Sequence, residues 1–216
     1  YDGRQVVPAE WVELSMTPYY HPIIPLLNAI DNMDCAQPDD PRPGFTHYPG
    51  GAERSRWHFE QGLACFERHF GDRPAGVWLS EGGISTDAVA TSGEFGFRWT
   101  ASGEAVLANS LPALREAETR DSLYSVYTLE GCDTRMLFRD DGLSDLIGFE
   151  YSSRHSDEAA SELVEHLEKI ADTLDDGLDE HVVSIILDGE NPWEYYPHNG
   201  HYFLDHLYEK LSDHPR

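Results

Sequence analysis

Three acidic side chains stand where they could carry out acid–base chemistry on a bound substrate. Glu81, Asp140 and Asp188 each follow a short apolar run within two residues, and a glycine comes within two residues after each acid. Glycine lets the backbone approach a bulky ligand closely. Cleavage of a glycosidic bond needs two carboxyl groups, one protonated and one ionised, and partial burial of like charges keeps one of them protonated. These acids are therefore candidates for catalysis on a sugar.

Aromatic residues lie beside these acids in the sequence, and their flat faces can stack on sugar rings. They are Tyr19, Tyr20, Trp78, Trp193, Tyr195 and Tyr196. Each feature also has a plainer explanation, because aromatic residues pack in cores and an Asp-Gly pair often forms a turn or a helix cap. A cluster of acids also binds Mg²⁺ or Ca²⁺. The residues alone therefore leave a sugar hydrolase and a metal-dependent hydrolase both open.

The elements that would position these acids alternate between strands and helices. Apolar runs predict buried parallel strands over residues 12–16, 76–79, 97–100, 135–138 and 182–187. Helical periodicity of the apolar residues predicts helices over residues 53–70, 157–175 and 199–212, and polar residues mark helix starts near Thr86 and Ser156. This alternation predicts an α/β fold with a parallel sheet, in which ligand sites gather at the carboxyl ends of the strands.

The length and the ends of the chain predict its organisation. With 216 residues the chain can bury one substantial core, and we expect residues 1–216 to form a single domain. The chain begins at Tyr1 and not at Met, so we expect a piece of a longer protein, truncated at both ends. Residues 37–51 are rich in Pro, Gly and Asp and predict a long loop.

The charge balance excludes several classes of partner. The chain has 40 acidic and 15 basic residues, a formal net charge of −25, and only two lysines, Lys169 and Lys210. A field of this sign repels phosphate backbones and anionic lipids, so we expect neither nucleic acid nor membrane as a partner. The sequence also lacks an apolar run of about 18 residues, the length that a membrane span needs. We expect a cytoplasmic location.

The dispersed acidic residues and the scarcity of lysine are typical of a surface adapted to high salt, so we expect a halophilic source. Self-repulsion among the carboxylates is screened by added ions. The midpoint of thermal unfolding is therefore expected to rise between low and molar salt. A midpoint that stays constant over this range would contradict the hypothesis.

Cysteine and histidine give no sign of a metal centre. The three cysteines, Cys35, Cys65 and Cys132, are widely spaced and form no CxxC pair, and the sequence contains no HExxH motif. We interpret the cysteines as buried free thiols and expect no disulfide framework and no zinc site. Two carboxyl groups suffice for cleavage of a glycosidic bond, so we expect no organic cofactor. The acidic loops leave calcium binding open, but the cleavage does not require it.

Four segments, taken together, resemble the signature regions of glycoside hydrolase family 57, in the order in which that family has them. They are VELSMTPYYHPIIPLL (residues 12–27), GVWLSEG (76–82), FRDDGLSDLIGF (138–149) and IILDGENPWEYY (185–196). The last two are long and specific, and the third is typical of amylopullulanase-like and α-amylase-like members. The family's amino-terminal His-Gln-Pro region is missing, which agrees with a chain that starts after the first barrel strand.

The resemblance implies a fold, a mechanism and a set of site residues. The fold is an incomplete parallel (β/α) barrel, seven-stranded and TIM-like in the family, which here lacks its first strand. The mechanism is a retaining double displacement on α-glucosidic linkages, with Glu81 as nucleophile and Asp188 as general acid/base. Supporting or substrate-binding residues carried over by motif are Glu13, His21, Trp78, Arg139, Asp140, Asp145, Glu190 and Trp193. Asp145 has an alternative role as a cap of the element that follows it.

The resemblance further implies an α-glucan substrate and makes the remainder of the same catalytic chain a partner. A barrel without one strand exposes sheet edges, so we do not expect this piece to be a competent enzyme by itself. Hydrolysis of the α-amylase or amylopullulanase type is favoured. A 4-α-glucanotransferase or branching enzyme with the same carboxyl pair and a non-catalytic glucan-binding relative are the alternatives. A deacetylase-like metal enzyme is disfavoured, because no His-x-x-x-His follows a predicted strand.

Overall fold

The computed structural model describes residues 12–36, 39–41, 43–113, 121–174, 178–189 and 191–215. The described residues form two compact units, and each unit has its own hydrophobic core. The first unit comprises Tyr1–Ser102 and Tyr127–Leu137, and the second comprises Gly103–Val126 and Phe138–Arg216. The single domain expected over residues 1–216 stays a prediction.

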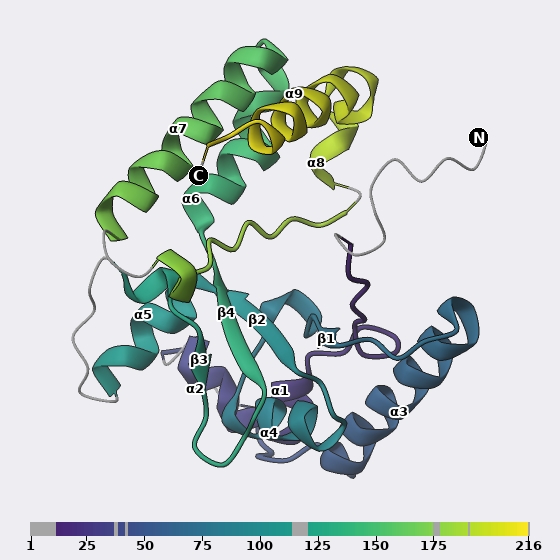
Figure 1. Ribbon diagram of the computed structural model, residues 1–216. Helices are drawn as coiled ribbons and strands as arrows, with labels where there is room; N and C mark the ends of the chain where they lie inside the picture. The colour runs from purple at the N-terminus through teal and green to yellow at the C-terminus, as the bar shows by residue number, and fades with distance from the viewer. Residues whose placement is uncertain are drawn as a thin grey trace. The chain divides into compact units, whose positions relative to one another are not determined.

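A four-stranded sheet has the order β1-β2-β4-β3 (Figure 1). Its strands are β1 (Gly76–Val77), β2 (Trp99–Gly103), β3 (Tyr127–Thr128) and β4 (Arg135–Arg139). β1 pairs with β2 in parallel, with Gly76 opposite Trp99, whereas β3 and β4 form an antiparallel pair. Gly76 is required here because a Cβ at this position would lie 2.0 Å from the Trp99 ring.

Two of the predicted strands are reduced to single parallel bridges. In residues 12–16 only Met16 pairs, with Val77, and in residues 182–187 only Ser184 pairs, with Arg139. Val12 and Leu14 are about half exposed, so the first run is not the buried strand that its composition predicts. β3 was not predicted, because two residues are too few to show alternation.

The helices of the first unit are α1 (Ile24–Asn28), α2 (Met33–Ala36), α3 (Gly51–Phe70) and α4 (Thr86–Glu94). Short 3₁₀ segments lie at Ile30–Asn32 and Ser80–Gly82. The α3 helix confirms the prediction over residues 53–70, and α4 begins at Thr86 as expected, with the Ser85 side chain accepting from the Ala88 N–H. The core contains Met16, Ile24, Phe59, Leu63, Phe66, Val77, Leu79, Ala88 and Phe97.

The second unit is built mainly from helices. They are α5 (Glu104–Ala113), α6 (Asp141–Asp145), the π-helix Leu146–Glu150, α7 (Ser156–Leu174), α8 (Asn191–Glu194) and α9 (His201–Ser212). Short 3₁₀ segments lie at Ser122–Tyr124, Tyr151–Ser153, Leu178–Glu180 and Pro197–Gly200. The α7 and α9 helices confirm the predicted helices over residues 157–175 and 199–212. Leu163 in α7, and Phe203 and Leu207 in α9, are buried in the core, whereas Leu211 is exposed.

The α7 and α9 helices pack side by side (Figure 1). An ion pair of 2.9 Å joins Lys210 on α9 to Asp157 on α7, and the hydrogen bond and charge of Lys210 lower the pKa of Asp157. The buried core between them contains Leu163, Tyr151 and Phe203. Burial, with the nearby Glu162 carboxylate, raises the pKa of Tyr151 to about 12.

The long loop predicted over residues 37–51 agrees with the structure, since its described residues before Gly51 lie in neither helix nor strand. No described helix is long and apolar enough to cross a membrane.

Candidate active site

Glu81 lies in a strained turn at the carboxyl end of β1. Its backbone is left-handed, with φ 56° and ψ 21°, and Gly82 follows with φ 65°. Hydrogen bonds from Gly82 N to Leu79 O (2.8 Å) and from Gly83 N to Ser80 O (3.0 Å) close the turn. A residue with a Cβ occupies this region at a cost of about 1 to 2 kcal/mol, and such strain concentrates at functional sites. The Glu81 side chain is 76% exposed and can be reached from solvent.

His21 contacts the Glu81 carboxylate and is itself in a left-handed conformation. His21 has φ 55°, and the preceding Tyr20 has φ 61°. The His21 Nε2 atom lies 3.3 Å from Glu81 Oε1, and Nδ1 lies 2.9 Å from Thr17 Oγ1. An ionised carboxylate only accepts hydrogen bonds, so this contact requires a proton on Nε2. His21 and Glu81 both have a strained backbone and lie 60 positions apart in the sequence, yet their side chains are in contact.

The other predicted site residues of the first unit lie around the sheet. Trp78 is partly buried, and its backbone N–H donates to the Met16 carbonyl oxygen at 2.8 Å. Glu13 accepts from the Trp99 indole N–H at 2.6 Å and forms an ion pair of 3.4 Å with Arg98. Trp99 is the partner that sequence reasoning missed, because it lies 86 residues from Glu13. A role of Glu13 and Trp78 in binding sugar stays a prediction.

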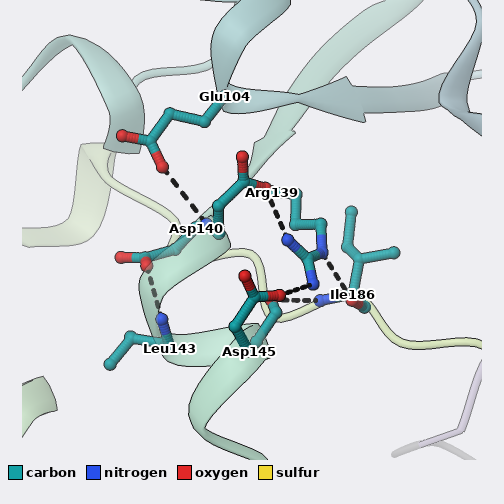
Figure 2. A network of polar contacts seen from close by, with 8 residues as sticks. Glu104, Arg139, Asp140, Leu143, Asp145 and Ile186 are labelled. Atoms are coloured by element: carbon teal, nitrogen blue, oxygen red, sulfur yellow. Dashed lines mark hydrogen bonds and ion pairs between the residues drawn. The ribbon is translucent and has the colours of Figure 1, made fainter. Parts of the chain in front are cut away.

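Arg139 is the centre of a polar network in the second unit (Figure 2). Its Nε donates to the Ile186 carbonyl at 2.9 Å, and its terminal nitrogens donate to Asp141 at 2.5 Å and to Asp145 at 2.7 Å. Burial acts to lower the pKa of Arg139, but the hydrogen bonds and charges of Asp145 and Asp141 outweigh it, and the pKa is raised. The guanidinium is thus held charged, and it ties the start of α6 to residue 186.

Asp140 caps a helix, which is the plainer of the two explanations for an acid at a strand end. It is the N-cap of α6, and Oδ1 accepts from Leu143 N at 2.8 Å (Figure 2). Oδ2 accepts from the Tyr124 hydroxyl at 3.0 Å, and the residue is buried. Glu104 adds a contact of 3.2 Å to the N–H of Asp141, a partner that no sequence pattern marked. The substrate-binding role expected for Asp140 stays a prediction beside this capping role.

Asp188 is exposed and follows a segment that the Arg139 network fixes. Two residues before it, the Ile186 N–H donates to Ser144 Oγ at 3.2 Å, while the Ile186 carbonyl accepts from Arg139. The structure therefore places Arg139, Asp145 and the backbone leading to Asp188 in one network. Asp145 pairs with Arg139, and its side chain makes no capping hydrogen bond to the π-helix Leu146–Glu150 that follows it. The alternative role of Asp145 as a cap is therefore not confirmed.

Trp193 and Glu190 complete the predicted set. Trp193 in α8 is partly buried, with its ring centroid 5.4 Å from that of Tyr196. A Cβ on Gly200 would lie 2.5 Å from the Trp193 ring, so this glycine is needed for the packing. Glu190 lies outside the described residues. Among the residues that the structure describes, no group of three or more His, Cys, Asp or Glu side chains is arranged to hold a metal ion.

Substitution of Arg139 by Gln is expected to lower the free energy of unfolding by about 2 to 3 kcal/mol. The change leaves Asp141, Asp145 and the Ile186 carbonyl without a cationic donor, and breaking a partly buried ion pair is costly. Urea unfolding measures the difference. Arg154→Gln is the control, because Arg154 pairs with Glu162 in the same unit but is more exposed, at 36% against 22%. Equal losses in the two variants would contradict the role of Arg139.

Comparison with known proteins gives the family to which this chain belongs. Residues 3–216 match the model of glycosyl hydrolase family 57. The chain therefore belongs to glycosyl hydrolase family 57, as its motifs predicted. The comparison with curated proteins found no match.

Solved structures with a similar fold include three enzymes. A branching enzyme of this family from Thermococcus kodakaraensis has a TM-score of 0.59 at 13% identity, over 96% of this chain and 48% of its own. The α-amylase AmyC from Thermotoga maritima has a TM-score of 0.64 at 13% identity, over 94% and 46%. The 4-α-glucanotransferase from Thermococcus litoralis has a TM-score of 0.55 at 17% identity, over 94% and 24%.

The chain thus spans about half the length, or less, of the solved structures that it matches. The shared fold confirms the predicted fold class, an α/β chain with an incomplete parallel barrel.

Proposed function

We propose that the protein containing this chain is a retaining glycoside hydrolase that acts on α-glucans, with Glu81 as nucleophile and Asp188 as general acid/base. The observation that supports this most strongly is the left-handed turn at Glu81. It exposes the carboxylate at the end of β1 and brings it within 3.3 Å of the His21 ring in a chain of glycosyl hydrolase family 57. Backbone strain of this kind is retained where it serves a function.

The proposed reaction proceeds in two displacements. The ionised Glu81 attacks the anomeric carbon while the glycosidic C–O bond breaks, and the departing oxygen takes the proton of the Asp188 carboxyl group. The first displacement leaves a covalent intermediate, a glucosyl ester on Glu81. In the second step the Asp188 carboxylate takes a proton from water, the water oxygen bonds to the anomeric carbon, and the ester bond to Glu81 breaks. Two inversions give net retention, and both carboxyl groups return to their initial states.

The supporting residues have distinct roles in this proposal. His21 Nε2, 3.3 Å from Glu81 Oε1, is proposed to orient the carboxylate that attacks the anomeric carbon. Arg139 fixes the backbone two residues before Asp188, so that this carboxyl group is presented at a constant position. Trp78 and Trp193 are proposed to contact the sugar rings, together with Glu13, Asp145 and Glu190. No cofactor takes part, and we propose a cytoplasmic location.

Transfer of the glucosyl group to another sugar is the alternative for the same residues. Enzymes with the same fold are named as an α-amylase, a branching enzyme and a 4-α-glucanotransferase. The segment LSDLIGF, residues 143–149, resembles amylase-type members and favours hydrolysis over transfer. The proposed substrates are α-1,4 linkages alone or together with α-1,6 linkages, and the segment does not distinguish these two cases. The third option, a non-catalytic glucan-binding relative, would be favoured by loss of either catalytic acid, and both are present.

Product analysis distinguishes these functions. The full-length protein is incubated in molar salt with maltoheptaose and, separately, with pullulan, and the products are separated by chromatography. Shorter oligosaccharides with new reducing ends are the expected result, and cleavage of pullulan would indicate the amylopullulanase type. Longer products with a constant number of reducing ends would show a transferase. Unchanged substrates, with binding of maltoheptaose retained, would show the non-catalytic relative.

A further inference from the structure

A buried hydroxyl on a neighbouring strand holds the turn that carries Glu81. Ser102 lies in β2, and its Oγ donates a hydrogen bond of 2.7 Å to the carbonyl oxygen of Gly82. The residue is 0% exposed, so water does not compete for this bond. Gly82 directly follows Glu81, and β1 and β2 are adjacent in the sheet. The bond therefore crosses from β2 to the peptide next to the proposed nucleophile.

The turn needs such a restraint because Glu81, a residue with a side chain, has a positive φ. Glu81 has φ 56° and Gly82 has φ 65°. The bonds from Gly82 N and Gly83 N are internal to the turn, since their acceptors are Leu79 and Ser80. They fix the shape of the turn, whereas the bond from Ser102 fixes its position relative to the sheet. Without that donor, a strained non-glycine residue has a lower barrier to relaxing toward the extended region.

We propose that Ser102 is a positioning residue for Glu81. In this role Ser102 does not contact the substrate. It holds the Gly82 carbonyl in place, and the Glu81 carboxylate next to it therefore faces the anomeric carbon. A nucleophile displaced by about 1 Å loses about 100-fold in rate. The inference depends on the proposed role of Glu81, but the position of the Glu81 backbone can be tested without any assay of activity.

Three variants test the role of the Ser102 hydroxyl. Ser102→Ala removes the donor, and Ser102→Thr keeps it. Ser92→Ala is the matched control, because Ser92 is also 0% exposed in the first unit and its Oγ donates to a carbonyl, that of Ala88 in α4, at 2.9 Å. The control thus removes a buried hydroxyl of the same kind from a position that has no bond to the Glu81 turn.

The first measurement is the backbone chemical shift of Glu81, whose ¹³Cα and ¹³Cβ values report a left-handed or extended conformation. We expect the shifts to move toward extended values in Ser102→Ala and to stay at the wild-type values in Ser102→Thr and Ser92→Ala. The second measurement is kcat and KM on maltoheptaose with the full-length protein. We expect kcat to fall about 10- to 100-fold in Ser102→Ala, with KM changed less than kcat and with partial or full recovery in Ser102→Thr.

Two outcomes would overturn the proposal. One is a folded Ser102→Ala variant with wild-type shifts at Glu81 and a wild-type kcat. The other is an equal loss of kcat in Ser92→Ala, which would show a general effect on folding. A fully active Glu81→Gln variant would contradict the proposed function instead, while a moved Glu81 shift in Ser102→Ala would still support the positioning role.

Discussion

In the full-length protein, the Glu81→Gln variant is expected to lose turnover of α-glucans by at least about four orders of magnitude, because nucleophile removal has effects of this size in other hydrolases. Glutamine has nearly the same shape as glutamate, and its amide oxygen can still accept from His21, so the turn and its contacts are retained. What is lost is the ability to form an ester at the anomeric carbon. The loss should appear in kcat, with the unfolding midpoint close to that of the wild type.

A smaller side chain at the same position allows a chemical test of the role. In Glu81→Ala or Glu81→Gly the space left by the carboxylate admits azide, which attacks the anomeric carbon once and gives a glucosyl azide of inverted configuration. Glu94→Gln is the control, because Glu94 in the same unit is an exposed glutamate paired with Arg56. Wild-type activity in Glu81→Gln, or an azide product of retained configuration from Glu81→Ala, would remove Glu81 from the role of nucleophile.

The Asp188→Ala variant is expected to lose about 1,000-fold in kcat on maltoheptaose, the range usual for removal of a general acid. A glucosyl oxygen is a poor leaving group unless it is protonated as the bond breaks. A substrate with an activated leaving group, such as a nitrophenyl maltooligoside, needs no proton, so its first step should remain fast. The second step would remain slow, because it lacks the Asp188 carboxylate that takes a proton from water. The glucosyl ester on Glu81 would therefore accumulate, and mass spectrometry of the intact protein would detect it.

Azide also separates the acid/base from the nucleophile. In Asp188→Ala, azide replaces water in the second displacement, so the product should have retained configuration, opposite to that from the Glu81 variants. Asp179→Ala is the control, since Asp179 is an exposed acid in the same unit. If the activated and natural substrates lose activity equally in Asp188→Ala, proton donation is not the function of Asp188.

The long helices were predictable because their evidence is local. In α3, α7 and α9 the apolar residues recur at helical spacing, and most of them then lie in the buried cores. The exceptions are Trp57, Phe70 and Leu211, which are exposed. The motifs around Glu81 and Asp188 were equally visible, because each lies within a few consecutive residues, and together they predicted the family that the comparison confirms. The strands were less predictable: residues 12–16 are apolar in part, yet only Met16 forms a bridge.

The family, the fold class, the long helices and the strong negative charge could all be predicted, since they depend on composition and short-range patterns. The partners of the polar groups could not be predicted and are seen only in the folded chain. Ser102 meets Gly82 across 20 residues, Arg139 meets Ile186 across 47, and His21 meets Glu81 across 60. The structure also showed that Asp140 caps α6 and that Glu81 has a left-handed backbone. Contacts between distant residues leave no period in the sequence, because strand pairing and packing bring them together only after folding.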